Sequence, residues 1–177
     1  AGLPSPEKFF GFKPGSDRNL IGYDSLINYF NAMDQASDMI QMIESGFSPM
    51  GRKMYTVFIS SENNIRNLEN LKTINRELAL NANLSENQRN EFVKDGRVFL
   101  MATLSLHSTE VGPAQSSPLI AWRLITSGDP YIKRILEDVV FAFIPTHNPD
   151  GMEIVVENYK KYKGTKYEKS NLPGIYH

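Results

Sequence analysis

The sequence predicts an α/β fold in which a mixed sheet with a largely parallel core carries helices on both faces. Two observations support this class. Strand patterns alternate with helical patterns along the chain, and this order is typical of a sheet that is covered by helices. In addition, residues 98–104 and 139–144 are continuous apolar runs, which are typical of strands buried on both faces.

The first half of the chain is expected to form an arm, a helix and a hairpin. Residues 1–22 are rich in proline and glycine, which indicates an irregular N-terminal arm. The aromatic anchors of this arm are Phe9, Phe10 and Phe12. A helix is expected from Asp24, a good capping residue, to about Ser37. The patterns at 39–47 and 53–60 predict two strands joined by a Ser-Pro-Met-Gly turn.

The second half is expected to alternate helices with the two apolar strands. Apolar residues recur at helical spacing through residues 63–80, and a second short helix is expected after Ser85. Two further helices are expected at 117–126 and 130–137, between the apolar strands. Residues 23–177 are therefore expected to be part of a single α/β domain that follows the arm.

Composition excludes several classes of protein. The chain has no cysteine, which rules out disulfides, thiolate metal ligands and a cysteine nucleophile. Its formal net charge of -1 gives no reason to expect nucleic acid or an anionic membrane as a partner. No apolar stretch approaches the about 20 residues that span a bilayer. Because the chain begins at Ala1, a signal peptide is expected to have been removed, which favours a secreted or periplasmic location.

A histidine and a glutamate follow the first apolar strand. His107 and Glu110 come after residues 98–104, and the polar segment 147–151 comes after residues 139–144. Ligands of open α/β sheets bind beyond the carboxyl ends of the strands, and zinc accepts imidazole and carboxylate ligands. A purely structural interpretation also exists, in which His107 ends the strand and Glu110 begins a helix near its positive end. The Asn-Pro-Asp-Gly sequence is by itself a good generic turn.

Taken together, these segments resemble the zinc-dependent metallocarboxypeptidases related to carboxypeptidase A, and in particular a bacterial branch of that family. The matching segments are Pro4–Phe12, His107–Glu110, Asn148–Gly151, Asn158–Lys161 and Asn171–His177. The resemblance implies a partial carboxypeptidase fold, with His107 and Glu110 as two ligands of one zinc ion and a histidine as the third. Such a metal would lower the pKa of a water molecule and polarise the scissile carbonyl of a C-terminal peptide bond. A separate glutamate would act as general base.

The sequence departs from the family pattern after the Asn-Pro-Asp-Gly segment. We expect the third zinc ligand, the general-base glutamate and the groups that bind the substrate carboxylate beyond residue 177. His147 precedes a turn and His177 lies outside the third-ligand motif, so neither is assigned to the metal. Four lysines lack the planar fork of arginine and are not assigned to the oxyanion: Lys160, Lys161, Lys163 and Lys166.

The chain is therefore expected to be the N-terminal part of a longer catalytic domain that acts on peptides. Alone, it should bind zinc weakly, lack peptidase activity and expose apolar surface that allows self-association. Two other functions remain open. One is a zinc-dependent amidohydrolase or deacylase on the same scaffold, and the other is a non-catalytic binding module. The presence of both His107 and Glu110 counts against the binding module.

Overall fold

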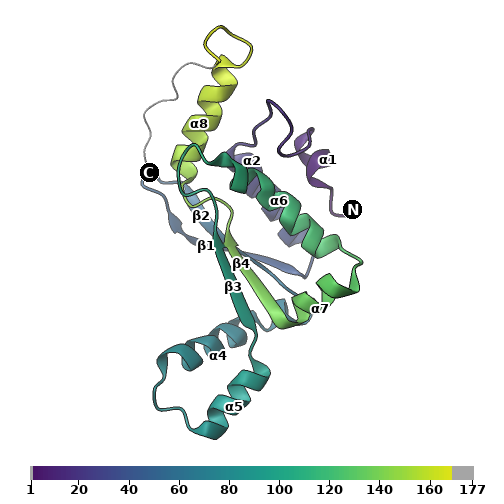
Figure 1. Cartoon of the computed structure of the whole chain (residues 1–177), viewed down its shortest axis with the longest axis vertical. Coiled ribbons are helices and arrows are strands. Elements are labelled where there is room, and N and C mark those ends of the chain that lie inside the picture. Colours follow the sequence, from purple (N-terminus) through teal and green to yellow (C-terminus); the bar gives the residue numbers. More distant parts are fainter. Residues whose placement is uncertain (1, 169–177) are drawn as a thin grey trace.

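A mixed sheet lies at the centre of residues 2–168, the part of the chain that the computed structural model describes (Figure 1). In chain order, the helices and strands are α1 (Pro6–Phe10), α2 (Tyr23–Ala36), β1 (Ile40–Phe47), β2 (Lys53–Ile59), α3 (Glu62–Arg66), α4 (Leu68–Leu80), α5 (Glu86–Asp95), β3 (Val98–Thr103), α6 (Val111–Thr126), α7 (Pro130–Asp138), β4 (Val139–Ile144) and α8 (Pro149–Tyr162). This arrangement confirms the predicted α/β class.

The sheet combines antiparallel and parallel pairs in the order β1-β2-β4-β3. The predicted hairpin is confirmed, since β1 pairs antiparallel with β2, and β2 also pairs antiparallel with β4. The two apolar strands, β3 and β4, run parallel, from Val98 opposite Val139 to Thr103 opposite Ile144. Because they are parallel and in register, both strands end at the same edge of the sheet.

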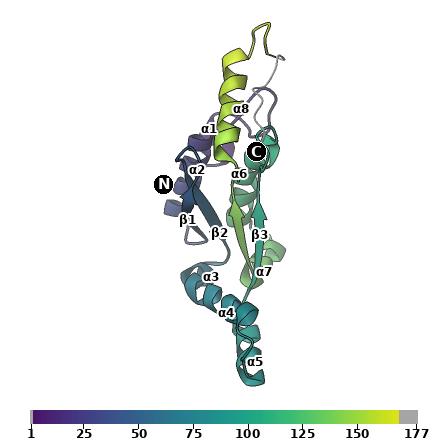
Figure 2. The same ribbon diagram turned by 90° about the vertical axis from the view of Figure 1, so that its left-hand side faces the viewer.

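Helices pack on both faces of the sheet, but they leave β3 largely exposed. On one face, α2, α6, α7 and α8 contribute to a buried core together with Val57, Ile59 and Phe143 of the central strands. On the opposite face, α4 packs on Phe58, Val140 and Ala142 through Leu68 and Leu71. These strand residues alternate between the two cores, as the twofold side-chain period of a strand requires. At one end of the elongated molecule, α4 and α5 project beyond the sheet (Figure 2).

β3 differs from its prediction. Residues 98–104 were expected to be buried on both faces, yet Val98, Leu100 and Met101 are each more than half exposed. The expectation was wrong because β3 is an edge strand of the described sheet and pairs only with β4. The equally apolar β4 lies between β2 and β3 and contains buried residues, as predicted. An apolar run therefore does not distinguish a central strand from an edge strand.

Three further elements differ in detail from the sequence prediction. The arm at residues 1–22 contains the short helix α1, which Ser5 caps by accepting the Lys8 N–H. The helix expected at 63–80 is divided into α3 and α4 at Asn67. The helix expected from residue 117 begins at Val111. Pro113 lies in its first turn, where a proline is tolerated, and Pro118 lies inside the helix. Along residues 2–168, no helix has the length and apolar character that crossing a membrane requires.

Candidate metal centre

The loops that follow β3 and β4 lie side by side. Beyond the paired strands, the Leu104 N–H donates to the Ile144 carbonyl at 3.1 Å. The His147 N–H in turn donates to the Leu104 carbonyl at 2.6 Å. We call residues 104–110 the first loop and residues 145–148 the second loop. The parallel pairing of the strands thus continues into both loops and brings them together.

The first loop brings the two predicted metal ligands together. His107 Nδ1 lies 2.8 Å from Glu110 Oε2, and the Glu110 N–H closes the turn by donating to the His107 carbonyl at 3.0 Å. Their side chains are 45% and 55% exposed, respectively, so a ligand can reach both from solvent. The hydrogen bond from His107 holds the pKa of the Glu110 carboxyl below its usual value. Glu110 is therefore an anion near neutral pH.

The donor set of this pair fits part of a zinc site. Imidazole nitrogen and carboxylate oxygen are both zinc ligands, and two such ligands of a tetrahedral ion lie about 3.4 Å apart. Small rotations of the exposed side chains would open the 2.8 Å separation to that distance. Within residues 2–168, no three histidine, aspartate or glutamate side chains converge to hold a metal, so His147 does not complete the pair. A catalytic zinc takes three protein ligands, of which this pair supplies two.

Two serines of the first loop stabilise its shape, a role that the sequence did not indicate. Ser105 adopts a positive φ of 51°, donates its hydroxyl to the Glu110 carbonyl at 2.7 Å and accepts the Ala114 N–H at 2.9 Å. Ser108 is buried, and its Oγ lies 3.4 Å from Asn148 Nδ2 in the second loop. Both hydroxyls therefore connect the first loop to its surroundings, and neither lies in a nucleophile motif.

Asp150, in the first turn of α8, connects the start of this helix to the β1–β2 turn through hydrogen bonds. Its carboxylate accepts the Ser48 hydroxyl at 2.9 Å, the Met50 N–H at 3.0 Å and Arg52 Nη1 at 2.9 Å. Burial alone would raise the pKa of Asp150, but these three donors together hold it below its usual value. Asn148 caps the same helix by accepting the Gly151 N–H at 2.9 Å. The Asn-Pro-Asp-Gly segment is thus more than a generic turn.

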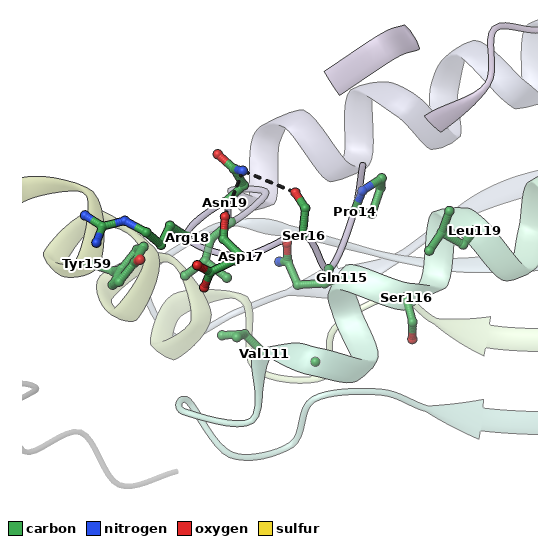
Figure 3. A pocket seen from close by; sticks show the side chains of 13 residues that line it. Pro14, Ser16, Asp17, Arg18, Asn19, Val111, Gln115, Ser116, Leu119 and Tyr159 are labelled. Atoms are coloured by element: carbon green, nitrogen blue, oxygen red, sulfur yellow. Dashed lines mark hydrogen bonds between the residues drawn. The ribbon is translucent and has the colours of Figure 1, made fainter. Parts of the chain in front are cut away.

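A pocket of about 440 Å³ lies next to the candidate pair, between residues 14–20, the start of α6 and Tyr159 of α8 (Figure 3). Val111, which follows Glu110 in the chain, lines the pocket, but His107 and Glu110 do not. Gln115 is buried at its base and bonds both the N–H and the carbonyl of Ile21, at 2.6 and 3.0 Å. Gln115 therefore fixes the N-terminal segment to α6.

The four lysines after Gly151, which were not assigned to the oxyanion, lie at the surface. Lys160, Lys161, Lys163 and Lys166 are all exposed. Lys161 Nζ lies 5.2 Å from the centre of the Tyr162 ring, and Lys166 Nζ lies 5.0 Å from that of Tyr167. His177 and the segment Asn171–His177 lie outside the described residues.

Comparison with known proteins gives one family and one fold. The family model for zinc carboxypeptidases matches residues 26–175. The carboxypeptidase A of Helicoverpa armigera is 12% identical, with a TM-score of 0.51 over 92% of this chain and 33% of that one. Thrombin activatable fibrinolysis inhibitor is 11% identical, with a TM-score of 0.52 over 82% of this chain and 30% of that one. A putative carboxypeptidase A from Shewanella denitrificans is 13% identical, with a TM-score of 0.50 over 82% and 32%.

The matched chains differ from this one in length. The chain spans about a third of the length of each of these three solved structures. At 11–13% identity, their likeness establishes the fold. No curated protein matches the sequence.

Proposed function

Because the chain belongs to the zinc carboxypeptidase family, we propose that it is the N-terminal part of a catalytic domain that hydrolyses C-terminal peptide bonds. The observation that carries this proposal is the convergence of His107 Nδ1 and Glu110 Oε2 to 2.8 Å. The pair lies just beyond the carboxyl ends of two parallel strands, the usual place for a ligand site in an open α/β sheet. Residues 23–177 would then be part of one catalytic domain.

In this proposal His107 and Glu110 are two protein ligands of one zinc ion. When bound, zinc supplies Lewis acidity that polarises the scissile carbonyl and makes a water molecule a better nucleophile. In the structure His107 Nδ1 donates its hydrogen bond to the ionised Glu110 carboxylate, so zinc binding at Nδ1 would require the ring proton to move to Nε2. Glu110 contributes a carboxylate that is already ionised, because its pKa is below the usual value. The exposure of both side chains leaves the remaining ligand positions open to peptide and water.

The remaining catalytic groups are proposed to lie outside this chain. They are the third zinc ligand, the general-base glutamate and the groups that bind the substrate carboxylate. The greater length of the matched structures, of which this chain spans about a third, supports this proposal. Two ligands enclose zinc poorly, so residues 1–177 alone should bind it weakly and should not hydrolyse peptides. We also propose that the protein is secreted or periplasmic.

The isolated chain is further proposed to self-associate through β3. This edge strand contains no charged residue and no proline, and Val98, Leu100 and Met101 are more than half exposed on it. Ile120 of α6 is half exposed and lines an apolar groove together with Leu100. Exposed apolar edge strands favour pairing with other chains.

Zinc calorimetry combined with a peptidase assay tests the proposed function. We expect weak 1:1 binding to residues 1–177 that His107→Ala abolishes. His147→Ala is the matched control, because it removes the other described histidine near the sheet edge, and it should leave binding unchanged. No release of C-terminal residues from a peptide should be detected. Zinc binding that survives His107→Ala would contradict the ligand assignment, and hydrolysis by residues 1–177 would contradict the proposal that catalytic groups lie elsewhere.

A further inference from the structure

The start of α8 lies against the first loop at a distance that leaves no room for a side chain. A Cβ atom at Gly151 would overlap the Ser108 hydroxyl. It would also lie 2.7 Å from Asn148 Nδ2 and 2.9 Å from Ser108 Cβ. Carbon atoms that are not bonded prefer separations of about 3.5–4.0 Å, so a methyl group at this position would have to displace its neighbours.

Ser108 has little freedom to move away. It is 2% exposed, and Asn148 Nδ2 lies 3.4 Å from its Oγ on the side of the second loop. Asn148 is itself held, because its Oδ1 accepts the Gly151 N–H at 2.9 Å. At the start of the first loop, Leu104 is bonded to the second loop and to β4 through its backbone. A displacement of Ser108 would therefore pass to its chain neighbour His107.

We propose that Gly151 is a positioning residue for the metal ligands and acts through Ser108. This inference rests on the proposed function, since it takes His107 and Glu110 to be zinc ligands. Because Gly151 has no side chain, the start of α8 can pack directly against the Ser108 side chain. Ser108 lies inside the turn that the Glu110 N–H closes on the His107 carbonyl at 3.0 Å, and this turn brings Nδ1 and Oε2 together. The Asn-Pro-Asp-Gly segment thus supports the site without contacting the metal.

Gly112 provides a matched control. It lies in α6 only two residues after Glu110, and a Cβ atom there would meet no atom within 4 Å. Gly112→Ala therefore places the same extra methyl group near the ligand pair without a steric conflict. Both substitutions replace a helical glycine by alanine, so their effects on helix propensity are similar.

The test measures zinc affinity of residues 1–177 by NMR titration of the His107 and Glu110 amide resonances. Gly151→Ala should weaken zinc binding about tenfold, the lower end of the effect of changes around metal ligands, and Gly112→Ala should leave it unchanged. A double-mutant cycle then examines the route. In a Ser108→Gly background, which removes both Ser108 atoms that meet the added methyl group, Gly151→Ala should change the affinity less than about threefold.

The outcomes separate this inference from the proposed function. Equal zinc affinity of Gly151→Ala and wild type overturns the positioning role, as does an undiminished loss in the Ser108→Gly background, which would indicate general damage to α8. If the wild-type chain binds no zinc at this pair, the proposed function fails. The positioning of His107 by Gly151 is then tested by the amide shifts of the two glycine variants without zinc. A larger shift of the His107 amide in Gly151→Ala than in Gly112→Ala supports positioning through Ser108, and an equal shift overturns it.

Discussion

Replacing Asp150 by asparagine removes the charge that fastens the β1–β2 turn to the start of α8. The carboxylate accepts bonds from Ser48, Met50 and Arg52, all at 2.9–3.0 Å. An asparagine keeps one acceptor oxygen, but its NH2 group replaces the second oxygen and would face a hydrogen-bond donor. Removing one partner of a buried ion pair lowers the free energy of unfolding by about 3–5 kcal/mol. The Arg52 side chain is 29% exposed and can be hydrated, so we expect a smaller loss of about 2–3 kcal/mol for Asp150→Asn.

Urea denaturation at pH 7, followed by circular dichroism, measures this loss in the free energy of unfolding. Glu44→Gln is the matched control, because it breaks the Glu44–Lys53 pair, which has the same 2.9 Å separation but side chains that are 40% and 58% exposed. Exposed pairs contribute about 0–1 kcal/mol. A loss for Asp150→Asn no larger than that for Glu44→Gln would refute the reasoning.

The same variant has an expected pH dependence. The pKa of Asp150 is lower in the folded chain than its ordinary value, so its stabilising contribution is complete above the ordinary value. The contribution is then lost as the pH falls through the folded pKa. The difference in unfolding free energy between wild type and Asp150→Asn should therefore shrink in acid. A difference that stays constant from neutral to acid pH would show that the ionised carboxylate is not responsible.

Three other substitutions test further contacts. Ser105→Ala leaves a buried N–H of α6 without its acceptor and should cost about 1–2 kcal/mol in thermal denaturation, whereas an unchanged melting temperature would contradict this role. Gln115→Ala removes both bonds to Ile21 and should cost about 2–3 kcal/mol and speed proteolysis of the N-terminal segment, whereas wild-type protection would contradict its role. Leu100→Lys should reduce self-association in sedimentation equilibrium more than Phe47→Lys on the opposite edge strand, and equal effects would show that β3 is not the contact.

Local sequence patterns predicted most elements of the fold, and the differences have identifiable causes. The hairpin, α2, α5, α7 and β4 follow from turn residues, caps and hydrophobic periodicity, which act over a few residues. The exposure of β3 depends on its place in the sheet, and that place is set by pairing between distant segments. The early start of α6 was missed because prolines such as Pro118 indicate a break when they are considered locally.

The candidate site was predictable to a similar extent. The meeting of His107 with Glu110 follows from a short turn after a strand, and their distance confirms that the two side chains converge. The contacts of Asp150 could not be found in this way, because its partners Ser48 and Arg52 precede it by about a hundred residues in the chain. The close approach of Gly151 to Ser108 is likewise a property of the folded chain alone.

Anomalous diffraction at the zinc edge, from crystals of residues 1–177 soaked in zinc, tests the central claim most directly. We predict one peak within about 2.0–2.2 Å of both His107 Nδ1 and a Glu110 carboxylate oxygen. The peak should disappear in His107→Ala crystals soaked in the same way. Zinc bound at His147 instead, or no peak beside His107 and Glu110 at saturating zinc, would contradict the assignment of this pair as metal ligands.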